Sequence, residues 1–231
     1  MIDFGPFLSS SASTSHRVDT AKAILNAFEQ YGFLYITNHG ISSSDVDEAF
    51  KQSAAFFSLS LDAKNALAWD RPESNRGYSC MGQEKVTNAT DKDGVADLRA
   101  SNPDLKESYE IGRDGVPGMP NQWPKEEASA LQASAFRHQM MKFFAICKQL
   151  HAEILRAIAL GLGIDEHWFD DYTRIGDNTL RLLHYPAVDR HVFERNKGQV
   201  RAGAHTDYGS LTLLFQDTRG GLQVQGPDGN T

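Results

Sequence analysis

The hydrophobic pattern of the chain changes its period along the sequence. In residues 16–31 the apolar side chains recur at helical spacing, which predicts a helix. From residue 178 onward, four short segments bounded by turn residues have the composition and alternation of strands: 179–186, 198–203, 210–217 and 221–225. Helices followed by strands indicate an α+β fold with a sheet or barrel in the later part of the chain.

Cap and turn residues predict further elements in the first part of the chain. GFLYITNHG at 32–40 has the pattern of a short strand that ends in a turn. Ser43 or Ser44, followed by acidic residues, is a typical N-cap. These signals predict a helix over 43–57. Ser60 or Asp62 is placed to begin another short helix.

The middle of the chain predicts one strand and one long helix. ESYEIG at 107–112 has the pattern of a short strand within a region rich in Gly and Pro. A helix is expected over about 124–160, because a proline suits its first turn and Gly161 and Gly163 suit its end. Asp165 is placed to cap one more short helix, through Phe169.

Composition and charge exclude some classes of protein. The chain has 23 Lys and Arg against 30 Asp and Glu, a net charge of −7, whereas nucleic-acid binders show a basic surface. Two cysteines, Cys80 and Cys147, form no disulfide framework and favour a reducing compartment. We find no secretory signal pattern, and charges interrupt the apolar region around 140–162. We expect a cytoplasmic monomer with no nucleic-acid or membrane partner.

The segment RAGAHTDYGSLTLLF, residues 201–215, carries the candidate chemistry. His205 and Asp207 stand two residues apart just before an apolar strand pattern, and side chains at this spacing on a strand share one face. An imidazole and a carboxylate on one face suit a divalent metal such as Fe(II), and a facial triad needs a third ligand. On its own, a His-x-Asp pair is more often structural.

The same segment, extended to AHTDYGSLTLLFQDTRGGLQV, resembles the metal-binding segment of the Fe(II)/2-oxoglutarate-dependent oxygenases, in the branch that contains isopenicillin N synthase. The resemblance covers essentially the whole chain, and its strength lies in the order and spacing of the matching segments. The other segments are IDFGPF at the start, GFLYITNHGI at 32–41, FFSLSLDAK at 56–64, RGYSCMGQE at 76–84, DLKESYEIG at 104–112 and LRLLHYP at 180–186.

The resemblance implies a double-stranded β-helix, or jelly roll, with a helical N-terminal region. Residues 1–123 would form the N-terminal oxygenase region, and 124–231 the long helix and the first half of the β-helix. Fe(II) would be held by His205, Asp207 and a distal His, and a later Arg would bind 2-oxoglutarate. Only 24 residues follow Asp207 and no His follows His205, so we expect this chain to lack the distal His and that Arg.

The resemblance also implies roles for residues outside the His-x-Asp pair. Tyr185 would line the site and bind the co-substrate, and Arg181 shares its strand face and is placed to meet an anionic co-substrate or substrate. The alternatives are a packed strand aromatic for Tyr185 and a salt-bridged arginine for Arg181. Arg76 and Tyr78 are candidate substrate contacts, with a structural role as the alternative. We expect no substitute third ligand among the other histidines.

The reaction implied is the oxidation of a small molecule by O2, with Fe(II) as cofactor and 2-oxoglutarate as co-substrate. Hydroxylation, desaturation and ring closure are all compatible with the residues. One alternative is an isopenicillin N synthase-like oxidase that uses no 2-oxoglutarate, and another is a non-catalytic truncated remnant. If the natural chain ends at Thr231, we expect weak Fe(II) binding and no substrate-coupled succinate production.

Overall fold

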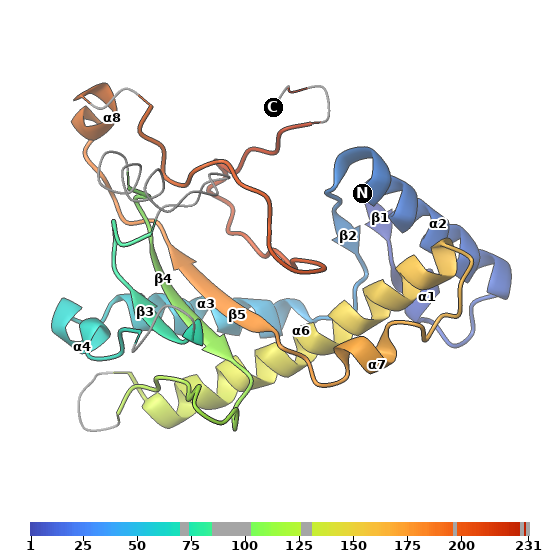
Figure 1. Cartoon of the computed structure of the whole chain (residues 1–231), viewed down its shortest axis with the longest axis horizontal. Coiled ribbons are helices and arrows are strands. Elements are labelled where there is room, and N and C mark those ends of the chain that lie inside the picture. Colours follow the sequence, from blue (N-terminus) through green and yellow to red (C-terminus); the bar gives the residue numbers. More distant parts are fainter. Residues whose placement is uncertain (70–73, 85–102, 126–130, 196–197, 227–228, 230–231) are drawn as a thin grey trace. The chain divides into compact units, whose positions relative to one another are not determined.

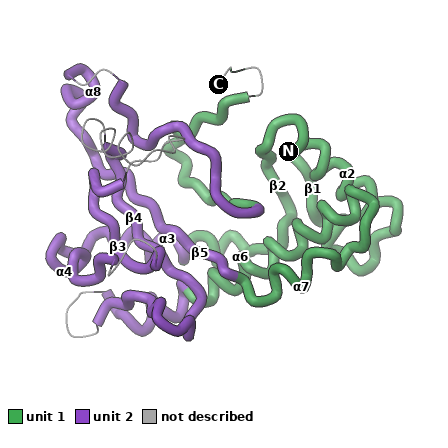
Figure 2. The backbone as a smooth tube through the Cα atoms, in the orientation of Figure 1, with its two compact units in different colours: residues 1–48, 141–176, 211–231 green, residues 49–140, 177–210 purple. Residues whose placement is uncertain are grey.

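The computed structural model describes residues 1–69, 74–84, 103–125, 131–195, 198–226 and 229. The chain is α+β, with helices and small sheets labelled in Figure 1. It divides into two compact units, which Figure 2 colours separately: unit 1 comprises 1–48, 141–176 and 211–231, and unit 2 comprises 49–140 and 177–210. The expected division after residue 123 stays a prediction.

Unit 1 begins with a two-stranded parallel sheet. β1 (Ile2–Asp3) pairs with β2 (Ile36–Thr37), which occupies only part of the strand predicted at 32–40. Parallel neighbours need a crossover connection, and here it contains the short α1 (Gly5–Leu8) and α2 (Thr14–Tyr31). α2 confirms the helix predicted over 16–31.

Local capping signals account for the bounds of three helices. The Ser13 side chain accepts the His16 N–H at the start of α2, as an N-cap does. α3 (Ser43–Phe57) confirms the helix predicted there, although the hydroxyl that accepts the Asp45 N–H belongs to Ser42, one position before the expected cap. Ser60 caps α4 (Leu61–Asn65), which confirms the short helix predicted to begin at Ser60 or Asp62.

The longest described helix is α6 (Ala133–Gly161), whose end at Gly161 agrees with the prediction. Gly161 lies against α2, since an added Cβ there would come within 2.9 Å of the Ala21 carbonyl oxygen. The start expected near Pro124 is wrong for the described residues, and 126–130 lie outside them. Before this helix, the Asn121 side chain accepts the N–H of Gly112 and donates to its carbonyl oxygen, both at 2.8 Å. None of the helices in the described part of the chain could cross a membrane.

The short helix expected from Asp165 through Phe169 is wrong, because these residues form a turn and no helix. Asp165 accepts the N–H of His167, two residues on, at 2.8 Å and forms a local turn in place of a helix cap. α7 (Asp170–Thr173) follows this turn. A further short helix, α8 (His191–Arg195), lies in unit 2 and was not predicted.

Unit 2 contains the three-stranded antiparallel sheet that positions the candidate site. β4 (Glu107–Gly112) lies between β3 (Gly77–Ser79) and β5 (Thr179–His184), as Figure 1 shows, and it confirms the strand predicted at 107–112. One face of the sheet is mostly apolar, with Glu107 as a charged exception, and it packs on helices α3 and α6. There the Phe56 ring lies 4.2 Å from the ring of Tyr109. The other face carries charged side chains.

Three of the four predicted late strands are wrong in this structure. Only the first of the four, predicted at 179–186, contains a strand, which is β5 (Thr179–His184). The segments 198–203, 210–217 and 221–225 have no regular structure in their described residues. A strand needs a neighbour that accepts and donates its backbone hydrogen bonds. Among the described residues, no strand pairs with these segments.

Candidate metal and co-substrate site

The structure brings the side chains of His205 and Asp207 together. His205 Nδ1 lies 2.8 Å from the carbonyl oxygen of Gly203, and a carbonyl only accepts hydrogen bonds, so Nδ1 carries the proton. The other ring nitrogen, Nε2, lies 3.5 Å from Asp207 Oδ1. In the neutral imidazole, the lone pair of Nε2 therefore faces a carboxylate oxygen, and a cation between the two atoms would be bound by both.

The donor set of this pair fits a divalent metal. Imidazole and carboxylate ligands bind such ions at about 2.0–2.2 Å, so two ligand atoms on one ion lie about 3 Å apart. The observed 3.5 Å between Nε2 and Oδ1 is close to this separation. The side chains of His205 and Asp207 are 37% and 49% exposed, so an ion can reach the pair from solvent. Within the part of the chain that is described, no third His, Cys, Asp or Glu joins the pair.

The pair lies in an irregular segment, whereas the sequence predicted a strand end or a turn before a strand. The segment is held to the residues before β4, since Leu105 N–H donates to Arg201 O at 2.9 Å. Gly203 N–H also donates to Asp104 Oδ1 at 3.1 Å. Gly203, whose carbonyl oxygen orients His205, is therefore itself held in place by Asp104 of unit 2. Sequence reasoning did not single out Asp104.

Arg181 lies on the charged face of the sheet and is already paired. Its guanidinium donates to Glu84, and its Nε lies 3.4 Å from Oε1 of Glu110, its partner across β4 and β5. Burial raises the pKa of Glu110, an effect that Arg181 opposes. The side chain of Arg181 is 36% exposed. The arginine therefore reaches solvent with its charge largely compensated, as in the salt-bridged alternative.

Tyr185 follows β5 directly and is 43% exposed. The Arg201 guanidinium carbon lies 5.6 Å from the centre of its ring, within the range of a cation–π contact. Partial burial raises the pKa of the Tyr185 hydroxyl, so it is a neutral hydrogen-bond donor at pH 7. Tyr185 lies one residue beyond the end of β5, so its position on the same face as Arg181 stays a prediction.

The two candidate substrate contacts are buried in unit 2. Arg76 is 3% exposed and donates to the carbonyl oxygens of Ser74 and Asn75. Tyr78 is 1% exposed, and its hydroxyl donates to Glu107. Their role in substrate binding stays a prediction, and these positions favour the structural alternative.

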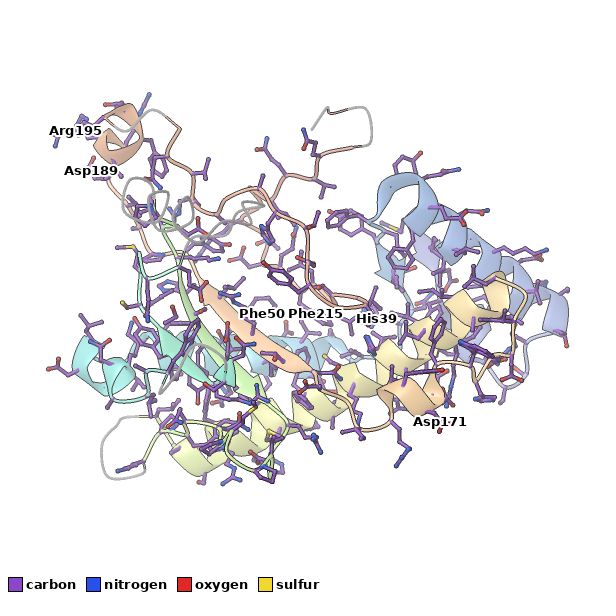
Figure 3. The ribbon with its side chains drawn as sticks, viewed as in Figure 1. His39, Phe50, Asp171, Asp189, Arg195 and Phe215 are labelled. Carbon is purple, nitrogen blue, oxygen red and sulfur yellow. The ribbon has the colours of Figure 1, made fainter. Side chains whose placement is uncertain are left out.

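Three histidines outside the pair have separate partners. His184 Nδ1 lies 2.7 Å from Glu107 Oε1, and His191 Nδ1 lies 2.8 Å from Glu194 Oε2. In unit 1 the ring of His39 lies beside that of Phe215, with centres 6.3 Å apart, and Figure 3 labels both.

Comparison with known proteins identifies the family. A family model described as the N-terminal part of the non-haem dioxygenase in morphine synthesis matches residues 1–126, which is more than half of the chain. The chain belongs to the 2-oxoglutarate–Fe(II) oxygenase family. The resemblance seen in the sequence is thus confirmed at the level of the family, whose members use Fe(II) and 2-oxoglutarate.

Individual oxygenases match nearly all of the chain. The 2-oxoglutarate-Fe(II) type oxidoreductase ppzD of Metarhizium rileyi is 37% identical, in an alignment that covers 97% of this chain and 62% of that protein. The proline hydroxylase buaE of Petromyces alliaceus is 37% identical over 86% of this chain and 59% of its own length. The chain thus spans less than two thirds of the length of these two relatives.

Solved structures match the fold over nearly the whole chain. A full-length protein from Neurospora crassa, solved in complex with alpha-KG and thymine, has a TM-score of 0.87 and 51% identity. The match covers 99% of this chain and 67% of the Neurospora protein. A 2OG-Fe(II) oxygenase family protein from Caulobacter crescentus has a TM-score of 0.75 and 28% identity, with the same coverage.

Proposed function

We propose that this chain carries two of the three Fe(II) ligands of a 2-oxoglutarate-dependent oxygenase that oxidises a small molecule with O2. The observation that carries the proposal is the orientation of His205, whose Nδ1 proton is bound by Gly203 O while Nε2 faces Asp207 Oδ1. A metal-binding histidine almost always donates its second N–H to such an acceptor. In this proposal, the third Fe(II) ligand and the rest of the jelly roll lie outside the described residues.

The residues of the chain would prepare the site as follows. Gly203 O fixes the His205 tautomer, so that a lone pair is available at Nε2. Asp207 supplies an anionic oxygen beside it. Fe(II) bound by these groups would supply the oxidising chemistry with 2-oxoglutarate and O2, because a facial triad leaves positions open for both.

We also propose that the sheet face with Tyr185 and Arg181 meets the co-substrate. The Tyr185 hydroxyl offers one neutral hydrogen-bond donor, and Arg181 offers a guanidinium that already binds Glu84 and Glu110. A carboxylate of 2-oxoglutarate would need to compete with Glu84 for this guanidinium. The relatives named as 2-oxoglutarate oxidoreductases favour this co-substrate over the oxidase without 2-oxoglutarate.

For the substrate we propose a pyrimidine base. The Neurospora crassa protein that was solved with thymine bound shares 51% identity with this chain, in a match that covers 99% of it. The proline hydroxylase buaE shares 37% identity. Thymine is therefore the first compound to test, and proline is the matched comparison.

The test uses the natural protein, whose length is first established by intact-mass measurement. Purified protein is supplied with Fe(II), 2-oxoglutarate and O2, and succinate is measured with thymine, with proline and without substrate. We expect thymine to stimulate succinate production. We expect His205→Ala or Asp207→Ala to abolish it, while His191→Ala leaves it unchanged. Full turnover in either ligand variant would refute the assignment of the site.

A further inference from the structure

Asp104 lies just before β4, and its carboxylate is fully buried at 0% exposure. Its Oδ1 accepts the N–H of Gly203 at 3.1 Å. Its Oδ2 lies 3.3 Å from the ammonium of Lys106, which is 5% exposed. The carboxylate thus joins a buried cation to the backbone of the segment that carries the candidate ligands.

Gly203 is held on both sides. Its N–H donates to Asp104, and its carbonyl oxygen accepts the Nδ1 proton of His205 at 2.8 Å. A displacement of Gly203 would therefore move the acceptor that sets the tautomer and direction of the imidazole. Two other hydrogen bonds hold the same segments together, from Leu105 N to Arg201 O at 2.9 Å and from Gln199 Nε2 to Pro103 O at 2.8 Å.

Asp104 is the first of a row of side chains with alternating charges, which ends at Arg181 on the charged face of the sheet. Lys106 lies between Asp104 and Glu84, 3.3 Å from one carboxylate and 3.4 Å from the other. Glu84 in turn accepts from Arg181. A buried ion pair gains little net stability, because its desolvation offsets its attraction. Its main effect here is geometric, since it fixes the carboxylate that receives Gly203.

We infer that Asp104 is a positioning residue for the metal ligand His205, acting through Gly203. The inference rests on the proposed function, because it assumes that His205 binds Fe(II). The alternative is that Asp104 only stabilises unit 2. A purely structural role lowers the stability of the protein without a specific change in metal affinity, so the two can be separated.

The test measures the Kd for Fe(II) of the full 231-residue chain under anaerobic conditions, by competition with a chromophoric chelator. The variants are Asp104→Ala and Asp104→Asn, with His205→Ala as the reference for loss of a ligand. The matched control is Asp114→Asn, because Asp114 is also in unit 2 and accepts hydrogen bonds, from Asn121 and Arg137, away from Gly203. Thermal unfolding of each variant is recorded in parallel.

We expect Asp104→Ala to raise the Kd about tenfold, the lower end of the range for residues that orient a metal ligand. Asp104→Asn should raise it less, because the amide oxygen can still accept from Gly203. Asp114→Asn should leave the Kd unchanged even where it lowers the Tm. If Asp104→Ala does not fold, Asp104→Asn alone decides, and a Kd equal to that of the wild type then overturns the inference.

The other outcomes separate the two claims. If the wild type binds Fe(II), His205→Ala weakens binding and both Asp104 variants bind normally, only the positioning role is overturned. If the Kd rises in the Asp114 variant as much as in the Asp104 variants, the effect is general destabilisation and the inference is also overturned. If the folded wild type binds no Fe(II), or His205→Ala binds equally well, the proposed function falls and the inference falls with it.

Discussion

Glu107 and His184 are partners across β4 and β5, and the imidazole Nδ1 lies 2.7 Å from Glu107 Oε1. The same carboxylate accepts hydrogen bonds from the Lys64 ammonium at 2.8 Å and from the Tyr78 hydroxyl. α4, β3, β4 and β5 thus each contribute one polar side chain to a cluster whose carboxylate is 7% exposed. The cluster anchors the end of β5, directly before Tyr185.

Replacement of Glu107 by Gln should destabilise unit 2. The change leaves the buried Lys64 ammonium without its anionic partner. Removing one partner of a buried pair costs about 3–5 kcal/mol, and we expect about 3 kcal/mol because the amide oxygen still accepts one hydrogen bond. Urea unfolding at neutral pH measures the loss.

The matched control for this change is Glu194→Gln. Glu194 pairs with Arg190 and His191 on the surface and is 49% exposed, so its loss should cost less than about 1 kcal/mol. A loss in Glu107→Gln as small as that in the control would contradict the role of the cluster.

The same carboxylate should make stability depend on acid pH. Burial alone would raise the pKa of Glu107, but the hydrogen bonds from Lys64, Tyr78 and His184 outweigh it and hold the pKa below its ordinary value of 4.5. A carboxyl whose pKa is lowered by folding contributes stability above its unfolded pKa, and that stability is lost as the pH falls through the folded pKa. The free energy of unfolding of the wild type should therefore decrease below about pH 4.5.

Urea unfolding at a series of pH values checks this dependence. Glu107→Gln should show a shallower decrease over the same acid range, because it has no carboxyl to protonate at this position. Parallel curves for the wild type and the variant would show that Glu107 does not titrate differently in the folded and unfolded chain.

Gly77→Ala should be far more harmful than the same change at Gly115. Gly77 has φ +113°, and an added Cβ would lie 2.4 Å from the carbonyl oxygen of Leu67. Gly115 also has a positive φ, +75°, but has open space around it. We expect about 1 kcal/mol of destabilisation at Gly115 from the backbone alone. At Gly77 we expect about 3 kcal/mol, because the clash adds to the strain. Equal losses in urea unfolding would argue against the close approach of β3 to Leu67.

Arg181→Met should weaken the binding of 2-oxoglutarate to the Fe(II)-loaded protein. Loss of a hydrogen bond to a charged group is worth about 1.5–3 kcal/mol, so we expect the Kd to rise about tenfold or more. Arg137→Met is the control, because Arg137 pairs with Asp114 and is 54% exposed. Anaerobic titration with 2-oxoglutarate gives both values. An unchanged Kd in Arg181→Met would leave Arg181 with only its salt bridges to Glu84 and Glu110.

The sequence predicted best the elements that local signals define. The helix at α2 was predicted from its apolar period, and in the structure it ends at Gly32, which has φ +69°. The strand at 107–112 was predicted over its whole length. The strands predicted at 210–217 and 221–225 are wrong. Alternation indicates which face a residue occupies, but a strand also needs a partner, which the alternation does not identify.

The candidate site shows the same limit. The spacing of His205 and Asp207 predicted that their side chains could meet, and they lie 3.5 Å apart. The bond between Asp104 and Gly203 spans 99 residues, and no local pattern signals it. The sequence does contain a signal for the buried role of Glu107. Alternation places its charge on the same face as Tyr109 and Ile111, which are both apolar and buried. A lone charge on such a face needs buried partners.

Anaerobic Fe(II) binding by the 231-residue chain decides whether His205 and Asp207 form a metal site. The wild type, His205→Ala, Asp207→Ala and the control His191→Ala are compared by competition with a chelator. We predict that the wild type and the control bind one Fe(II) with the same Kd, and that each ligand variant binds at least about tenfold more weakly. Equal affinity in all four proteins, or no binding by the folded wild type, would contradict a metal site at His205 and Asp207.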